Sequence, residues 1–116
     1  MKFKKSEKVF TVSSGRVSLS VESGDGQRGF HVLDIGDVVY DPDVDFNDTD
    51  LGSGTSLKSN GTAVHVISTI AMLNPSTTKA SITYTLADNN NEAQWVAEIE
   101  GVTETHAVLE MKIEFA

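Results

Sequence analysis

The sequence predicts an all-β domain in which two antiparallel sheets pack as a sandwich of about 7–8 strands, or close into a small barrel. Several segments alternate apolar and polar residues with a period of two, and turn signals separate them at regular intervals. In addition, no long segment shows the 3.6-residue apolar period of an amphipathic helix. Both observations favour β structure over helix.

The most apolar continuous segment is Val64–Leu73, and we expect the sheet to be organised around it. Four of its ten residues are β-branched aliphatics, and apolar residues fall at both odd and even positions. Such a pattern predicts a central strand buried on both faces. Turn-forming pairs, Asn60-Gly61 and Asn74-Pro75, bound the segment.

In the first half of the chain, Arg16–Glu22 gives the clearest strand signal. Val17, Leu19 and Val21 share one face of it and alternate with polar residues, which predicts a half-buried strand. A weaker strand is expected over residues 9–12. Two short strands are expected over residues 30–33 and 37–40, separated at a glycine.

The last third of the chain alternates over residues 80–86, 93–99 and 107–115. The connections at residues 87–92 and 101–106 are short and polar. Three such runs in succession predict a C-terminal three-strand antiparallel meander.

We expect one all-β domain over residues 9–116, preceded by a basic N-terminal arm over residues 1–8. The arm has a net charge of +3, whereas the rest of the chain has a net charge of −11. The arm contains Lys2, Lys4, Lys5 and Lys8. It is expected either to remain a solvated terminus or to dock on an acidic partner, such as another copy of the chain. The acidic body would repel a phosphate backbone, so direct nucleic-acid binding is not expected.

The chain has no cysteine, which excludes disulfides, zinc–thiolate sites and a thiol nucleophile. Its basic first residues are not followed by the apolar stretch of a secretory signal. No segment has the length and hydrophobicity of a membrane span. We therefore expect a cytoplasmic or virion location and no membrane association.

The segment Asp41–Gly54 combines a proline with many aspartates, which predicts a long exposed loop. Calcium prefers several oxygen ligands, and closely spaced acids can supply them. The candidate ligands are Asp41, Asp43, Asp45, Asn47, Asp48 and Asp50. The segment is not an EF-hand, because Phe46 and Gly52 occupy the positions of its glycine and glutamate. The alternative is a solvated or partner-facing acidic loop.

Motifs of catalytic or nucleotide sites are weak. Gly24–Gly29 matches G-x-G-x-x-G, but a strand pattern follows where a dinucleotide site needs a helix. The three histidines are far apart in the sequence, and no G-x-S-x-G motif is present. We therefore predict no catalytic residues and no enzymatic activity.

One strand face carries hydroxyl groups where a solvated face usually carries mixed charge. Its residues include Ser81, Thr83 and Thr85, which we take as candidate partner-binding residues. A face without charge is typical of the centre of a protein interface. The β propensity of threonine is the alternative explanation.

These observations favour a non-enzymatic interaction or structural module that binds a protein partner, itself or another. A symmetric homo-oligomer, such as a virion accessory part, would fit the basic arm and acidic body. Two alternatives stay open: an acidic inhibitor that imitates nucleic acid and blocks a basic groove, and a calcium- or carbohydrate-binding sandwich.

Overall fold

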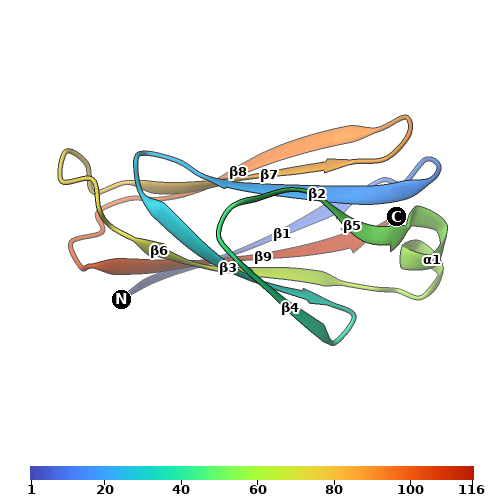
Figure 1. Cartoon of the computed structure of the whole chain (residues 1–116), viewed down its shortest axis with the longest axis horizontal. Helices are drawn as coiled ribbons and strands as arrows, with labels where there is room; N and C mark the ends of the chain where they lie inside the picture. Colours follow the sequence, from blue (N-terminus) through green and yellow to red (C-terminus); the bar gives the residue numbers. More distant parts are fainter.

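The computed structural model describes all 116 residues, and it consists of nine strands and one short helix. Two sheets pack against each other as layers (Figure 1). The first has the strand order β1-β9-β6-β3-β4 and the second β5-β2-β7-β8. The elements are β1 Lys2–Phe10, β2 Arg16–Ser23, β3 Arg28–Ile35, β4 Val38–Asp43, β5 Phe46–Ser53, α1 Gly54–Ser59, β6 Val64–Ala71, β7 Ala80–Ala87, β8 Glu92–Ile99 and β9 His106–Phe115. The predicted two-sheet sandwich is confirmed.

The core lies between the sheets and follows the alternation of the sequence. In β2, Val17, Leu19 and Val21 are fully buried, as their spacing predicted. The even-numbered residues of β7 lie beside them in the same sheet, and the odd-numbered residues of β9 face them across the interior. Burying one large aliphatic side chain contributes about 1.5–3 kcal/mol, so these rows supply most of the stabilisation.

Strand β6 is the central strand of the first sheet, as predicted for this segment. Its burial, however, is one-sided. Val64, Val66 and Ile70 are buried, whereas Ile67 on the opposite face is 39% exposed. The prediction of burial on both faces was wrong, because the second sheet covers only one face of β6.

The predicted C-terminal meander is only half correct. Strands β7 and β8 form an antiparallel hairpin. Strand β9 does not continue it, since it crosses to the first sheet and pairs with β6 and β1. The crossing is anchored where the Val102 N–H donates to the Thr78 carbonyl at 2.9 Å. Alternation in the sequence defines which residues share a face, but the same pattern suits either sheet.

The predicted long loop Asp41–Gly54 is mostly strand. β4 continues to Asp43 and β5 begins at Phe46, so the segment carries the chain from the first sheet to the second. Asp43 and Asp48 have φ angles of +70° and +52°, a left-handed conformation that aspartate tolerates better than most residues. The aspartates therefore bend two edge strands and do not replace them with a loop.

Helix α1 follows β5 directly. The side chain of Ser53 caps its first turn by accepting a hydrogen bond from Ser56 N–H, and Leu57 anchors it in the core. Six residues are too few to establish a 3.6-residue period, which is why the sequence did not indicate this helix. No helix in the structure has both the length and the apolar character needed to cross a membrane.

The N-terminal residues form an edge strand and not a separate arm. β1 runs from Lys2 to Phe10 and pairs in parallel with β9 along its whole length. The boundary expected at residue 8 therefore falls inside a strand. Phe10 is buried at its end and meets Phe115 edge-to-face, with ring centroids 6.5 Å apart.

Asp88 ties the β7–β8 turn to the turn before β2. It accepts hydrogen bonds from the Ser13 hydroxyl and N–H, and from the N–H groups of Asn90 and Asn91. The Ser13 hydroxyl first, then these N–H groups, hold the pKa of Asp88 far below its ordinary value of 3.8, against the small opposing effect of burial.

We expect this carboxylate to make folding pH-dependent in acid. Its folded-state pKa is lower than its unfolded-state pKa, so its contribution is complete above about pH 4 and decreases as the pH falls below it. The Asp88→Asn variant should show a flatter decline of unfolding free energy between about pH 4 and pH 2 than the native chain. Parallel urea titrations at fixed pH values measure this difference, and identical slopes would contradict the assignment.

Candidate functional site

The predicted calcium ligands lie on separate elements. Asp41 and Asp43 belong to β4, Asp45 to the following link, and Asn47, Asp48 and Asp50 to β5. Asp50 is engaged with Arg16 at 2.7 Å. No group of three or more His, Asp or Glu side chains is arranged to hold a metal ion. The structure does not bring the predicted ligands together, so the calcium site stays a prediction without a formed ligand set.

Asp45 instead joins a hydrogen-bonded chain that reaches into the core. His31 Nε2 lies 2.7 Å from Asp45 Oδ1, and His31 Nδ1 lies 2.7 Å from Ser68 Oγ. His31 and Ser68 are buried, whereas the Asp45 side chain is 41% exposed. Ser23 donates to Asp45 through both its N–H and its hydroxyl. One carboxylate thus links the β4–β5 connection to β2 and β3.

The protonation pattern of this chain follows from its partners. Because Asp45 accepts, His31 Nε2 carries a proton, and in the neutral ring Nδ1 accepts from the Ser68 hydroxyl. Partial burial raises the pKa of Asp45, but the hydrogen bonds from Ser23 and His31 outweigh it and leave the pKa below 3.8. The carboxylate is therefore ionised wherever the domain is folded near neutral pH.

Ser68, His31 and Asp45 are the residue types of a hydrolytic triad, but their arrangement differs. In a triad the serine contacts Nε2 of the histidine and the carboxylate contacts Nδ1, whereas here the two nitrogens are exchanged. Ser68 is also 0% exposed, so no substrate can reach its hydroxyl. The arrangement satisfies buried polar groups and holds β3, β6 and the β4–β5 link together. Sequence reasoning missed it because its members are far apart in the chain.

The lysines of β1 were predicted to bind a partner, and two of them bind within the chain. Lys2 Nζ donates to the Glu100 carbonyl at 3.0 Å, and Lys4 Nζ donates to the Glu98 carbonyl at 2.8 Å. Glu98 belongs to β8, the edge strand of the second sheet, and Glu100 directly follows its end. Lys5 Nζ forms a long ion pair with the Glu110 carboxylate at 3.7 Å, and Lys8 forms no ion pair. Lys5 and Lys8 are therefore the lysines left to meet another molecule.

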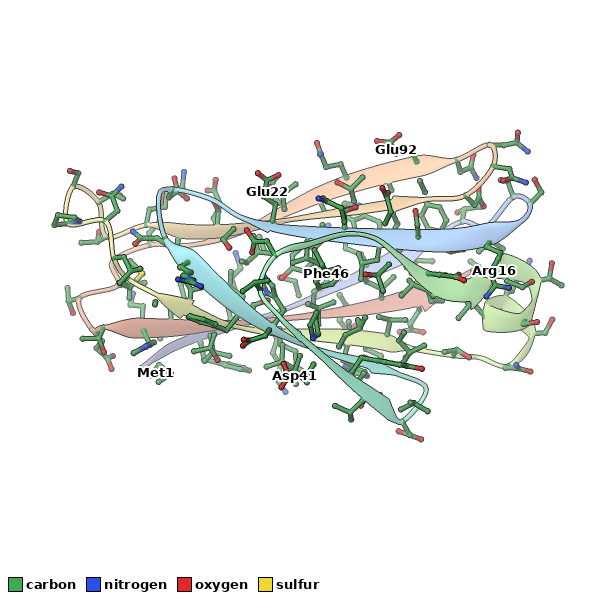
Figure 2. All side chains as sticks on the ribbon, in the orientation of Figure 1. Met1, Arg16, Glu22, Asp41, Phe46 and Glu92 are labelled. Atoms are coloured by element: carbon green, nitrogen blue, oxygen red, sulfur yellow. The ribbon has the colours of Figure 1, made fainter.

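The predicted hydroxyl face lies on the outside of the second sheet. Ser81 is nearly buried there and donates to Asp25 at 2.6 Å. Thr85 accepts from Gln94 at 3.2 Å, and Thr83 is half-buried opposite Val96. Figure 2 shows Glu22 and Glu92 on this side of the molecule, with Asp41 on the opposite side. The hydroxyl groups share a face, but part of their bonding capacity is used internally, and their partner role stays a prediction.

The outside of the first sheet carries a contiguous apolar surface that the sequence did not indicate. Phe3, Val108, Thr69 and Phe30 lie side by side across β1, β9, β6 and β3. The adjacent row adds Ile67 and Val32. We call the apolar members the outer apolar face: Phe3, Phe30, Val32, Ile67 and Val108.

This outer apolar face is accessible and flanked by charge. Phe3 is 53% exposed and Ile67 39% exposed, while the other members are half-buried. The guanidinium of Arg28 lies 5.3 Å from the Phe30 ring centroid, and Lys5 Nζ lies 5.7 Å from that of Phe3. An apolar centre with a charged rim is typical of protein interfaces. The sequence does carry one signal for this face: apolar residues occur at both odd and even positions of β6. That pattern predicted burial of both faces of the strand, but it reflects one buried face and one exposed apolar face.

Strand β4 is a second exposed apolar feature of the same sheet. Val38, Val39 and Tyr40 are 54%, 63% and 52% exposed. Successive residues of a strand point to opposite faces, so neither face of β4 is covered here. Figure 1 shows the tip of the β3–β4 hairpin projecting away from the second sheet. Since β3 is the only neighbour of β4, its other edge is free to accept a strand.

A polar depression of about 420 Å³ lies beside this hairpin. Its lining includes Asp34, Asp37, Asn60, Thr62 and His65, with a single apolar residue. Asp34 accepts the N–H of Asp37 at 2.9 Å and so closes the hairpin turn. Pockets for organic ligands are mostly apolar, so this depression suits water and small polar groups better.

Comparison of the chain with protein-family models, curated protein sequences and solved structures gave no match.

Proposed function

We propose that the chain is a non-enzymatic protein-interaction or structural module that docks through the outer apolar face of its first sheet. The exposure of Phe3 and Ile67 within a continuous apolar surface supports this proposal. Single exposed apolar residues are common on soluble proteins, but a set that crosses four adjacent strands is typical of an interaction site.

The position of this face suits docking without rearrangement. It is built on β6 and β9, whose opposite sides carry the core residues Val66, Leu109 and Met111. Side chains on such a framework keep their relative positions when a partner binds, which limits the entropic cost. Glu110 lies next to Ile67, and Lys5 lies on the far side of Glu110 in the same row; both supply charges that can orient a partner.

Ile67→Lys is expected to weaken association with the partner at least tenfold, because it places a charge at the centre of a surface that loses water on binding. Chemical cross-linking in cells that make the protein, followed by separation of the adducts, measures this change. Ile67 is exposed, so the substitution should preserve the fold, which circular dichroism verifies.

Val96→Lys is the matched control, since Val96 is 57% exposed on the outside of the second sheet. The proposal expects adducts of the native chain and of Val96→Lys, and their loss in Ile67→Lys. Equal adducts from both variants, or loss only with Val96→Lys, would refute docking through the first sheet.

A further inference from the structure

We propose that the chain also binds a second copy of itself, head to tail, with β4 of one copy added to the free edge of β1 in the next. This inference goes beyond the proposed function, because strand pairing uses the two edges of the first sheet and leaves the outer apolar face, centred on β6, uncovered. The first sheet ends in β1 on one side and in β4 on the other, so two copies can continue it.

The two edges carry opposite charge. β1 contains four lysines and one glutamate. β4 contains Asp41 and Asp43 and is flanked by Asp37 and Asp45. Two copies of β1 would repel each other, and so would two copies of β4, whereas β1 and β4 attract. The charges thus favour a head-to-tail contact over either symmetric one.

The strand directions are also compatible. β1 runs parallel to β9, and each further step through β6, β3 and β4 reverses direction. β4 therefore runs opposite to β1 within the sheet. When the sheet continues into a second copy in the same orientation, β4 and β1 meet as an antiparallel pair, the more stable pairing.

Apolar side chains on both edges can be buried by this contact. Phe3 and Val9 of β1 are 53% and 59% exposed. In a sheet continued in register, Val38 is level with Lys8, so Val9 comes near the exposed Val38 and Val39 of β4. Phe3 lies farther along β1, near the other end of β4. Val9 is on the same side of β1 as Phe3, and Val39 lies on that outer side beside Asp34, so the outer sides of successive copies would be continuous.

A head-to-tail contact generates a ring or an open filament, depending on the angle between copies. The contact of two short edge strands is smaller than a standard interface, so association should be weak and should increase with concentration. Because charge contributes, it should also weaken between 0.1 M and 1 M salt, where the screening length falls from about 10 Å to about 3 Å.

Complementary charge exchange tests the contact, with sedimentation velocity as the measurement. One variant carries Lys5→Glu and Lys8→Glu, which leaves Lys2 and Lys4 on their β8 carbonyls. The other carries Asp41→Lys and Asp37→Asn, since asparagine tolerates the φ of +70° at position 37. Lys58→Glu on α1, which belongs to neither edge strand, controls for net charge.

We expect the native chain and Lys58→Glu to associate with rising concentration. Each edge variant alone should associate at least tenfold more weakly, because the attraction between its edges is lost or reduced. The lysine variant changes the net charge of β1 from +3 to −1, and the aspartate variant changes that of β4 with its flanking aspartates from −4 to −1. An equimolar mixture of the two edge variants should recover association, because the unaltered β4 of one meets the unaltered β1 of the other.

A native chain that stays monomeric at all concentrations, or edge variants that associate as well as the native chain, would overturn the head-to-tail contact. Failure to recover in the mixture would overturn it as well. The proposed function is tested separately, because Ile67→Lys alters neither edge: adducts that persist in this variant refute docking through the outer apolar face and leave the edge contact standing.

Discussion

Tyr84→Ala is expected to lower the free energy of unfolding by about 3–5 kcal/mol, the range measured for truncating large buried aromatic residues. Tyr84 is 0% exposed and is the largest fully buried side chain of the core. A domain of this size has a total stability of about 5–15 kcal/mol, so the variant should lose a large part of it. Urea denaturation followed by far-ultraviolet circular dichroism measures the shift in midpoint.

Tyr84→Phe should act in the opposite direction. The Tyr84 hydroxyl is buried without a hydrogen-bond partner of good geometry. Burial raises the pKa of Tyr84 far above 10, and the approach of the Ser68 hydroxyl offsets only part of that rise. Because Ser68 already bonds His31, we expect removal of the Tyr84 hydroxyl to leave stability unchanged or raise it by up to about 1 kcal/mol.

The two tyrosine variants together separate packing from polar bonding. A loss of more than about 1 kcal/mol in Tyr84→Phe would contradict the expectation, since it would mean that the hydroxyl donates to Ser68 and extends the buried chain. A small effect of Tyr84→Ala would show that the interior relaxes around the cavity.

Asp45→Ala is the second substitution with a large expected effect, a loss of about 1–3 kcal/mol. The variant leaves His31 Nε2–H without its acceptor in a side chain that is almost fully buried. It also removes the acceptor for the Ser23 N–H and hydroxyl. Thermal or urea unfolding measures the loss.

Asp50→Ala is the matched control for Asp45→Ala. Both aspartates belong to the same acidic segment, but Asp50 is exposed and bonds the exposed Arg16. Exposed ion pairs contribute little, so stability should change hardly at all. Similar effects of the two variants would contradict the view that Asp45 acts through His31.

The strand segments could be predicted because alternation is a local property. Val17, Leu19 and Val21 alternate with polar residues, and any sheet that packs on one side must bury that row. The same logic identified the rows of β7 and β9. Alternation does not depend on which strands are neighbours. The buried row of β9 was therefore predicted correctly even though its pairing was not.

The acidic segment shows where local propensity fails. Asp41 and Asp43 disfavour strands on average, yet they occur in β4, whose free edge and exposed faces leave their carboxylates in water. Propensity scales describe a typical environment, and an edge strand is not typical. Strand geometry also distributes the candidate calcium ligands over β4, the following link and β5, and calcium binding by them stays a prediction.

The candidate site itself depended on long-range pairing. Phe3, Val108 and Phe30 share one row only because β1, β9 and β3 lie in one sheet, with Thr69 of β6 between Val108 and Phe30. Likewise, Ser68 and His31 are 37 residues apart in the chain and 2.7 Å apart in space. No window of sequence contains both partners, so no local pattern could reveal either contact.

The sequence by itself determined that this chain folds as an all-β sandwich or small barrel, and which residues of most strands face its core, because a period of two is imposed by backbone geometry alone. The tertiary structure decided where β9 pairs, that residues 2–10 form an edge strand, and which apolar residues are left uncovered. These depend on the order of strands in each sheet, and that order follows from the packing of the whole chain.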